Sequence, residues 1–254
     1  MASRNGLNPK IRGSKGKGFG RALPAAFGFD NGLKPNGTAM YFLVPGMLGK
    51  YINTSITFEI WCKAASVFNY TLAGMHWTGI IGGNSRFNMD ARDWNEFGYP
   101  TSGTKHLLKY FDLDNGKSGL IQNADPIGYR LGDLASFTSQ IPSYPVNDFT
   151  VNIEYSRSEV NIYPIDEFRV YNKVLPLNEV VTNYNNGMGA NPTTTENLLI
   201  WYKFETFELL DFSSLQDGSD IRLGMRDFSG NNNHGLPINM DTNSASSTYS
   251  LQPF

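Results

Sequence analysis

The sequence contains a single cysteine, Cys62, among its 254 residues, and it has no long hydrophobic run. One cysteine cannot form an intrachain disulfide, which excludes a disulfide framework. Membrane-spanning helices need about 20 consecutive apolar residues, and no such stretch occurs. The amino terminus also lacks the apolar core of a signal peptide. These absences predict a protein that is made and folded in a cytoplasm, without a membrane partner.

Charge is also scarce, because only 17% of the residues are charged and the net charge is −2. This near neutrality gives the whole molecule no electrostatic basis for binding nucleic acid. The charges are nevertheless distributed unevenly, since no acidic residue precedes Asp30. The basic residues before it are Arg4, Lys10, Arg12, Lys15, Lys17 and Arg21. The rest of the chain is correspondingly acidic.

Residues 1–24 are predicted to form an irregular basic arm, because four glycines between positions 13 and 20 oppose both helix and strand. One interpretation is a solvated tail. The other is an arm that orders on an acidic partner surface, with Phe19 and Leu23 as apolar anchors beside the basic residues. The segment lacks the strand–loop–helix setting of a phosphate-binding loop.

The remaining residues, 25–254, have the composition of an all-β domain. Asn-Gly pairs recur along the chain, and such pairs supply the positive φ that tight turns need. Apolar and polar residues alternate with a period of two, as in strands, over 56–63 and 149–156. Further strands are expected at 165–171 and 198–205. Their wide spacing in the sequence favours a two-sheet sandwich with crossing connections.

One short helix is predicted after the strand at 165–171. Pro176 suits the first turn, an apolar stripe follows over 177–184, and the Asn-Asn-Gly sequence at 185–187 ends it. By contrast, residues 84–145 are interpreted as long variable loops. Long loops in a compact domain are usually functional, so ligand specificity is expected there.

Three segments of the sequence resemble the laminin-G-like jelly roll of the concanavalin A-like family. They are Gly-Phe-Gly-Arg-Ala-Leu at 18–23 with Phe-Gly-Phe-Asp at 27–30, Ile-Thr-Phe-Glu-Ile-Trp at 56–61, and Ile-Asp-Glu-Phe-Arg-Val-Tyr at 165–171. The third continues into the predicted helix, as that motif normally does. The resemblance implies an antiparallel two-sheet jelly-roll sandwich. It does not extend to residues 77–145.

A fourth segment resembles the beginning of such a domain but comes last in this chain. It comprises Leu-Ile-Trp-Tyr-Lys-Phe-Glu at 199–205 and Asp-Phe-Ser-Gly-Asn-Asn-Asn-His-Gly at 227–235. Residues 198–238 are therefore interpreted as a displaced first-strand segment of a circularly permuted jelly roll. The alternatives are that residues 198–254 pair with a neighbouring subunit or belong to a truncated second copy.

The sequence predicts that the protein is not an enzyme. Glucanases of this fold carry alternate carboxylates on one strand, and retaining hydrolysis needs two carboxyls about 5 Å apart. No such run occurs, and Asp166 and Glu167 are consecutive, which on a regular strand places them on opposite faces. Asp227, Ser229 and His234 lie too close in sequence for a catalytic triad and are expected to shape a turn.

No cofactor is certain from the sequence. Three scattered histidines and one cysteine disfavour zinc. The family resemblance implies a calcium site at the sandwich rim, with Asp166, Asp227 and Asn231 as candidate ligands. Residues 112–116, Asp-Leu-Asp-Asn-Gly, form a separate oxygen-rich turn that lacks the distant glutamate of an EF-hand loop.

Aromatic residues predicted in loops, Trp77, Trp94 and Tyr99, are candidate platforms for a glycan, although burial or a protein interface is the alternative for each.

The sequence leaves two functions open. The first is a homo-oligomeric structural or decoration protein of a large assembly, specifically a phage virion (capsid or tail), attached through the basic arm. The second is a carbohydrate-binding lectin module, which the fold suggests by analogy.

Overall fold

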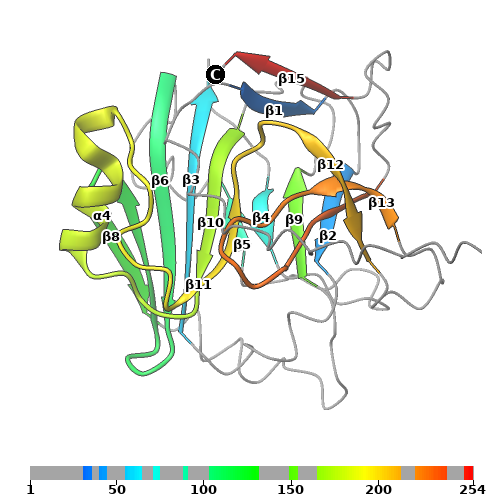
Figure 1. Cartoon of the computed structure of the whole chain (residues 1–254). Helices are drawn as coiled ribbons and strands as arrows, with labels where there is room; N and C mark the ends of the chain where they lie inside the picture. The colour runs from blue at the N-terminus through cyan, green and yellow to red at the C-terminus, as the bar shows by residue number, and fades with distance from the viewer. Residues whose placement is uncertain are drawn as a thin grey trace, which may run out of the picture.

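The computed structural model describes residues 31–35, 40–44, 55–64, 71–74, 88–90, 103–131, 149–153, 165–212, 221–238 and 249–253. These residues form an all-β, two-sheet antiparallel jelly-roll sandwich, as the sequence predicts (Figure 1). None of the helices in these ranges is long and apolar enough to cross a membrane.

The larger sheet, sheet A, has eight strands in the order β15-β1-β10-β3-β6-β7-β8, with β11 paired to β10 beside β1. Their bounds are β1 Asn31–Pro35, β3 Ile56–Ala64, β6 Gly103–Asp112, β7 Lys117–Gln122, β8 Asp125–Leu131, β10 Ile165–Tyr171, β11 Leu198–Tyr202 and β15 Tyr249–Pro253. The first and last described strands pair along their whole length, from Asn31 opposite Pro253 to Pro35 opposite Tyr249. Sheet A therefore gathers both ends of the described chain.

Sheet B has five strands in the order β14-β2-β9-β4-β5, and a separate hairpin is formed by β12 and β13. The bounds are β2 Met40–Val44, β4 Thr71–Gly74, β5 Asn88–Asp90, β9 Phe149–Ile153, β12 Phe207–Asp211, β13 Ile221–Met225 and β14 Leu236–Ile238. β14 carries the chain from the hairpin to the edge of sheet B, where it pairs with β2.

One helix, α4 (Leu177–Tyr184), lies over the face of sheet A that is turned away from sheet B (Figure 1). It begins after Pro176 and ends at Asn185, which has the left-handed φ of 46°. The 3-10 turn η1 (Asn185–Gly187) follows, and Gly187 has a φ of +89°. The Asn-Asn-Gly sequence therefore ends the helix as predicted, because Asn and Gly tolerate this conformation best.

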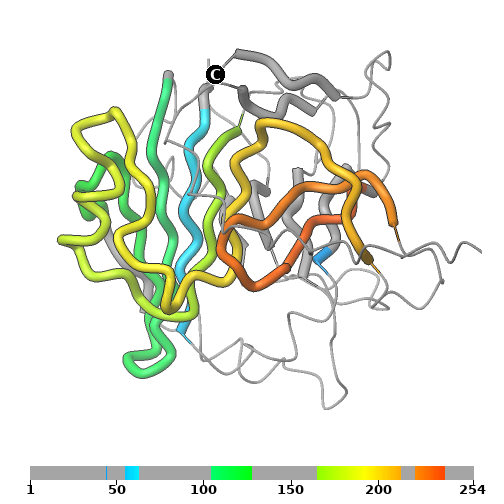
Figure 2. The backbone as a smooth tube through the Cα atoms, viewed as in Figure 1, coloured from blue at the N-terminus to red at the C-terminus, as the bar shows by residue number. Residues whose placement is uncertain are grey.

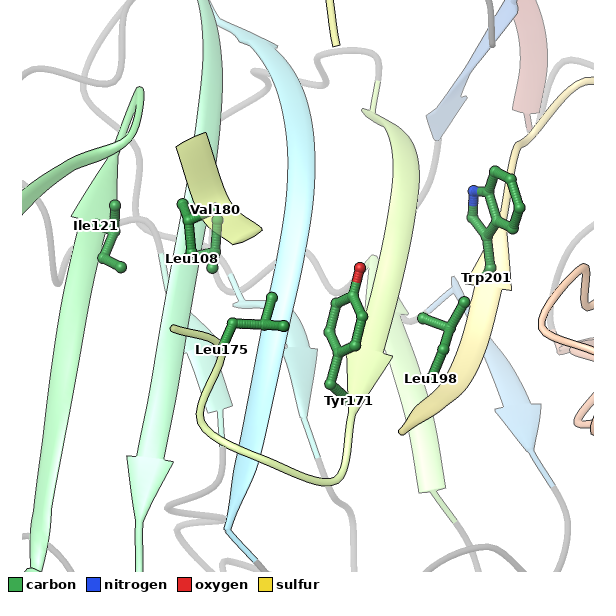
Figure 3. Close-up of a cluster of buried hydrophobic side chains, with 7 residues drawn as sticks. All are labelled: Leu108, Ile121, Tyr171, Leu175, Val180, Leu198 and Trp201. Carbon is green, nitrogen blue, oxygen red and sulfur yellow. The ribbon is translucent and has the colours of Figure 1, made fainter. Parts of the chain in front are cut away.

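Both faces of the central strands are buried. Phe58, Ile60, Phe168, Val170 and Ile200 are 0% exposed, and by strand alternation they point towards sheet B. The opposite side chains lie under α4, where Val180 of the helix packs near Leu108 of β6 (Figure 3). Leu175, Tyr171 and Trp201 continue this second layer along the sheet. The period-two pattern thus marks two buried faces, not one buried and one solvated.

The prediction of long loops over 84–145 is wrong for residues 103–131, which form the meander β6-β7-β8. The pattern fails there because both faces of β6 are buried: Leu107 and Leu108, which are adjacent in sequence, are each 0% exposed. A strand buried on both faces loses the polar alternation that identifies a strand from sequence.

Candidate functional site

A cluster of buried polar side chains lies between α4 and sheet A. We call it the Arg169 cluster; its members are Glu59, His106, Glu167, Arg169, Tyr171, Asn183 and Trp201. They come from β3, β6, β10, α4 and β11. The polar members other than Asn183 and Tyr171, which are 1% exposed, are completely buried. The cluster therefore joins the helix to four neighbouring strands.

Glu59 is the acceptor at the centre of this cluster. Its Oε1 lies 2.6 Å from His106 Nε2, and its Oε2 accepts hydrogen bonds from Tyr171 Oη at 2.9 Å and Asn183 Nδ2 at 3.1 Å. Arg169 Nη1 is 3.5 Å from the same Oε2. Burial by itself raises the pKa of Glu59, but Arg169 and His106 outweigh it and hold the pKa at about 2. Glu59 is therefore a charged carboxylate at neutral pH.

Arg169 also bonds to Glu167 and to the chain after the helix. Its Nη2 donates to Glu167 Oε2 at 3.0 Å and to the carbonyl of Ala190 at 2.7 Å. Trp201 Nε1 donates to Glu167 Oε2 at 2.5 Å, and Lys203 Nζ lies 4.5 Å from the centre of the Trp201 ring. A single cation thus holds two acidic side chains and one backbone carbonyl, which fixes the segment after α4 against the sheet.

A β-bulge interrupts the regular alternation of side chains in β10. The expectation that Asp166 and Glu167 lie on opposite faces assumed a regular strand. The register with β3 shifts between Asp166 and Arg169, and Glu167 has a left-handed φ of 49°. Burial and the nearby Glu167 carboxylate raise the pKa of Asp166 to about 9, so this acid is neutral at physiological pH. Both side chains are 0% exposed, so neither can reach a substrate.

Residues 227–235 cover the free edge of β11. Asp227 Oδ1 accepts the backbone N–H of Trp201 at 2.9 Å, and Asn233 Nδ2 donates to the carbonyl of Leu199 at 2.7 Å. Asn231 Nδ2 donates to the carbonyl of Leu198 at 2.6 Å. Side chains therefore take the place of a neighbouring strand on this part of the edge, which protects it from pairing with another chain.

The same segment confirms that Asp227, Ser229 and His234 shape a turn. Asp227 accepts hydrogen bonds from the backbone N–H groups of Ser229 and Asn233, both at 2.9 Å. His234 Nδ1 accepts the N–H of Asp227 at 3.1 Å, and burial lowers the pKa of this imidazole. His234 Nδ1 thus bonds to the backbone of Asp227, whereas a triad needs the carboxylate to orient the imidazole.

Hydrogen bonds occupy most of the candidate calcium ligands, although Asp166 Oδ2 is buried without a partner among the described residues. Both oxygens of Asp227 accept hydrogen bonds, and Asp166 Oδ1 accepts the N–H of Glu167 at 2.7 Å. Asn231 donates to a backbone carbonyl, as described above. Within the described ranges, no three His, Cys, Asp or Glu side chains gather closely enough to hold a metal ion. Calcium at Asp166, Asp227 and Asn231 stays a prediction from the family resemblance.

An accessible cleft opens at the rim of sheet A, where the β6–β7 turn meets the connection from β10 to α4. Figure 2 shows the backbone of this turn in green, below sheet A. We call it the rim cleft. Its volume is about 460 Å³, and it is lined by Ser55, Asp112, Leu113, Asp114, Asn115, Asn172, Lys173 and Val174. Most of these residues are polar, and the cleft combines carboxylate, amide, hydroxyl and ammonium groups.

Hydrogen bonds hold both walls of the rim cleft in place. Asp112 accepts the N–H of Asn115 at 3.1 Å and its Nδ2 at 2.7 Å, which closes the β6–β7 turn. Thr57 Oγ1 donates to the carbonyl of Lys173 at 2.7 Å and accepts the N–H of Leu175 at 3.2 Å. Both walls are therefore fixed before any ligand arrives, which lowers the entropic cost of binding.

One polar atom in the wall of the rim cleft is buried without a partner. Asn172 Oδ1 has no hydrogen-bond partner among the described residues, whereas Lys173 Nζ is held by Glu179 at 2.8 Å. Asp114 and Asn115 are exposed at the mouth. The cleft thus offers fixed acceptors and donors of the kind that recognise hydroxyl groups.

A second groove adjoins the rim cleft. Its volume is about 410 Å³, and its lining residues are Tyr110, Leu120, Ile121, Pro126, Ile127, Val174, Leu175 and Leu177. We call it the apolar groove. It lies between the start of α4 and strands β7 and β8, and Val174 lines both hollows.

The structure does not describe the aromatic and arm residues that the sequence suggests for ligand binding. Trp77, Trp94 and Tyr99 lie outside the described residues, as do the arm residues Arg4, Lys10, Arg12, Lys15, Lys17, Phe19 and Arg21. The tryptophans that the structure does describe, Trp61 and Trp201, are 2% and 3% exposed and therefore offer no surface for a sugar. The Asp112–Asn115 wall of the cleft does lie inside residues 84–145, where specificity was expected. Asn172 and Lys173 were not singled out, because nothing local in sequence places them beside that turn.

No family model and no curated protein matches the sequence. Among solved structures, a candidate carbohydrate-binding protein of Bacteroides ovatus is similar, with a TM-score of 0.50 and 16% identity over 88% of this chain and 60% of that one. The chain thus spans less than two thirds of that protein. The binding domain of botulinum neurotoxin serotype D matches with a TM-score of 0.40 and 13% identity over 87% of this chain and 69% of that one. At this level of identity the similarity establishes the two-sheet jelly-roll fold and nothing finer.

Proposed function

We propose that this protein is a non-catalytic carbohydrate-binding β-sandwich and that the rim cleft is its binding site. The observation that carries the proposal is the set of fixed polar groups that line an accessible cleft, among them the exposed side chains of Asp114 and Asn115. The Bacteroides ovatus protein of the same fold, itself a candidate carbohydrate binder, supports it.

We propose a non-catalytic function because the acidic residues named below are buried or already hydrogen-bonded. Glu59, Asp166 and Glu167 are completely buried, and the carboxylate of Asp112 is held by Asn115. Glycoside hydrolysis needs one protonated and one ionised carboxyl that both reach the glycosidic bond. We expect no release of reducing sugar from laminarin, agarose or mucin glycans. Release that disappears with a single Asp or Glu substitution would contradict this part of the proposal.

A panel of immobilised glycans tests the binding function. We expect the protein to bind at least one oligosaccharide, and Asp114→Ala at the cleft mouth to weaken that binding by about tenfold, as the loss of one charge-assisted hydrogen bond does. Asp125→Ala is the matched control, because Asp125 is also exposed, at the start of β8, and is outside the cleft lining. If the protein bound none of the glycans, the proposed function would be wrong.

A structural role in a large assembly, such as a phage virion made in the host cytoplasm, is the second candidate. The observation that favours it is the basic, glycine-rich sequence of residues 1–24, which lies outside the described residues. Exposed ion pairs weaken as salt rises, so attachment through this arm should be salt-sensitive. Deleting residues 2–17 should leave the melting of the body unchanged and reduce co-assembly. A truncated protein that assembles as well as the full chain, at low and high salt, would reject this role.

A further inference from the structure

We infer that the rim cleft and the apolar groove form one continuous binding groove for an uncharged oligosaccharide longer than one sugar unit, with the Tyr110 ring as its stacking platform. The inference rests on the proposed carbohydrate-binding function and specifies its ligand. It follows from three properties of the two hollows: their continuity, their contrast in polarity and their charge.

Continuity comes from Val174, which lines both hollows on the connection between β10 and α4. On one side of Val174 lie the polar groups of the β6–β7 turn. On the other side lie the apolar residues of β7, β8 and the first turn of α4. A ligand that fills both must extend past Val174, which a single sugar ring seated in the rim cleft does not do.

The contrast in polarity matches the two surfaces of a sugar. Sugar rings carry hydroxyl groups around the edge and C–H groups on their faces, so they pair a polar rim with an aromatic or aliphatic platform. Tyr110 is half-buried, and its ring lies so close over Gly119 of β7 that a side chain at that position would overlap it. Burial and the neighbouring Asp112 raise the pKa of Tyr110, so its hydroxyl stays protonated.

The charge of the groove selects against acidic sugars. Asp112 and Asp114 line the rim cleft, and among the described lining residues the ammonium group is that of Lys173, which is neutralised by both oxygens of Glu179 at 2.8 and 3.0 Å. A uronate, sialate or sulfate group would therefore meet uncompensated negative charge, and like-charge contacts are a strong element of specificity.

The exposed face of α4 provides a variant and its control. Leu177 lines the apolar groove and is 46% exposed, whereas Val181, one turn later on the same helix, is 50% exposed and is outside the groove lining. Glutamate is a good helix former, so Leu177→Glu and Val181→Glu place the same charge on the same helix at similar cost to folding. Only the first places it in the groove.

Isothermal titration of the full-length protein tests the inference. The probes are neutral cello-, malto-, xylo-, manno- and chito-oligosaccharides of one to six units, with oligogalacturonate and sialyllactose as acidic probes. We expect affinity for one neutral series to rise with length beyond the monosaccharide and the acidic probes to bind at least about tenfold more weakly. Leu177→Glu and Tyr110→Ala should each weaken the binding of the longer chains by about tenfold, while Val181→Glu binds as the parent does.

The outcomes separate this inference from the proposed function. If no probe binds, both fail. If a glycan binds but the monosaccharide binds as tightly as the hexasaccharide, or an acidic probe binds best, the protein is a lectin and the continuous neutral groove is wrong. Equal effects of Leu177→Glu and Val181→Glu on affinity, with melting temperatures unchanged, would also overturn it.

Discussion

Glu59 links α4 to sheet A through its hydrogen bond from Asn183. It is completely buried, and it faces His106, Tyr171, Asn183 and Arg169. Removing one partner from a buried ion pair leaves the other charge without compensation, at a cost of about 3–5 kcal/mol. Glu59→Gln should therefore lower the free energy of unfolding by about 3 kcal/mol in urea denaturation.

A surface ion pair supplies the matched control for that variant. Glu208 pairs with Arg226 on the β12–β13 hairpin, where the two side chains are 29% and 44% exposed. Exposed pairs contribute about 0–1 kcal/mol, so Glu208→Gln should change stability by less than about 1 kcal/mol. Similar losses in both variants would show that the Arg169 cluster does not hold the helix as described.

Asp166 makes the stability of the folded protein depend on pH in the opposite direction to Glu59. The folded pKa of Glu59, about 2, is below its ordinary value of 4.5, so its contribution is present above pH 4.5 and is lost as pH falls towards 2. The folded pKa of Asp166, about 9, is above its ordinary value of 3.8. The folded state therefore keeps a proton that the unfolded state releases, and stability falls as pH rises from 3.8 to 9.

Asp166→Asn tests this assignment, because an amide resembles the neutral acid and does not titrate. We expect the variant to be more stable than the parent at pH 8 by at least about 1 kcal/mol and close to the parent at pH 4. Urea denaturation at both pH values measures the difference. A variant that is less stable at pH 8 than at pH 4 relative to the parent would mean that Asp166 is ionised in the folded protein.

The sequence predicts these residues only in part. Period-two alternation places Glu59 opposite the apolar face of its strand, which suggests a solvated side chain. Its partners His106 and Asn183 lie 47 and 124 positions away, so no local pattern could reveal that the polar face is covered. The bulge at Glu167 was equally hidden, because a non-glycine residue with a left-handed φ leaves no compositional signal.

At the scale of elements, the edge of β11 is held by side chains of the loop that follows the β12–β13 hairpin. Asp227 accepts hydrogen bonds from the backbone of Trp201, Ser229 and Asn233. Because these are charge-assisted and partly buried, Asp227→Ala should cost about 2–4 kcal/mol in thermal or urea unfolding. Asp125→Ala, at the exposed start of β8, should cost less than about 0.5 kcal/mol. Equal losses of stability in the two variants would show that the loop does not support β11.

The element predictions succeed where local chemistry decides the structure. The short helix after Pro176 and its end at Asn185 follow from capping and turn residues, and the strands at 56–64, 165–171 and 198–202 follow from alternation. The meander at 103–131 was missed because its central strand is buried on both sides. The rim cleft forms because the tertiary fold places this meander beside residues 172–174, which are distant from it in sequence.

At the scale of the whole molecule, the last part of the chain is integral to the sandwich. β11 pairs with β10, β14 pairs with β2, and β15 pairs with β1. Leu198, Ile200 and Tyr202 are at most 1% exposed, and burying each such side chain contributes about 1.5–3 kcal/mol. A chain that ends at Asn197 should therefore be insoluble or melt without cooperativity in calorimetry. A soluble truncation with a sharp transition would show that residues 198–254 are a separate unit.

The central claim for the whole molecule is that a jelly-roll sandwich binds a glycan at its rim and not on its buried aromatic faces. A crystal structure with the tightest-binding neutral oligosaccharide tests it most directly. The account predicts sugar density between the β6–β7 turn and Asn172–Val174, extending over Tyr110. Sugar bound on another surface, with the rim cleft empty, would contradict the account.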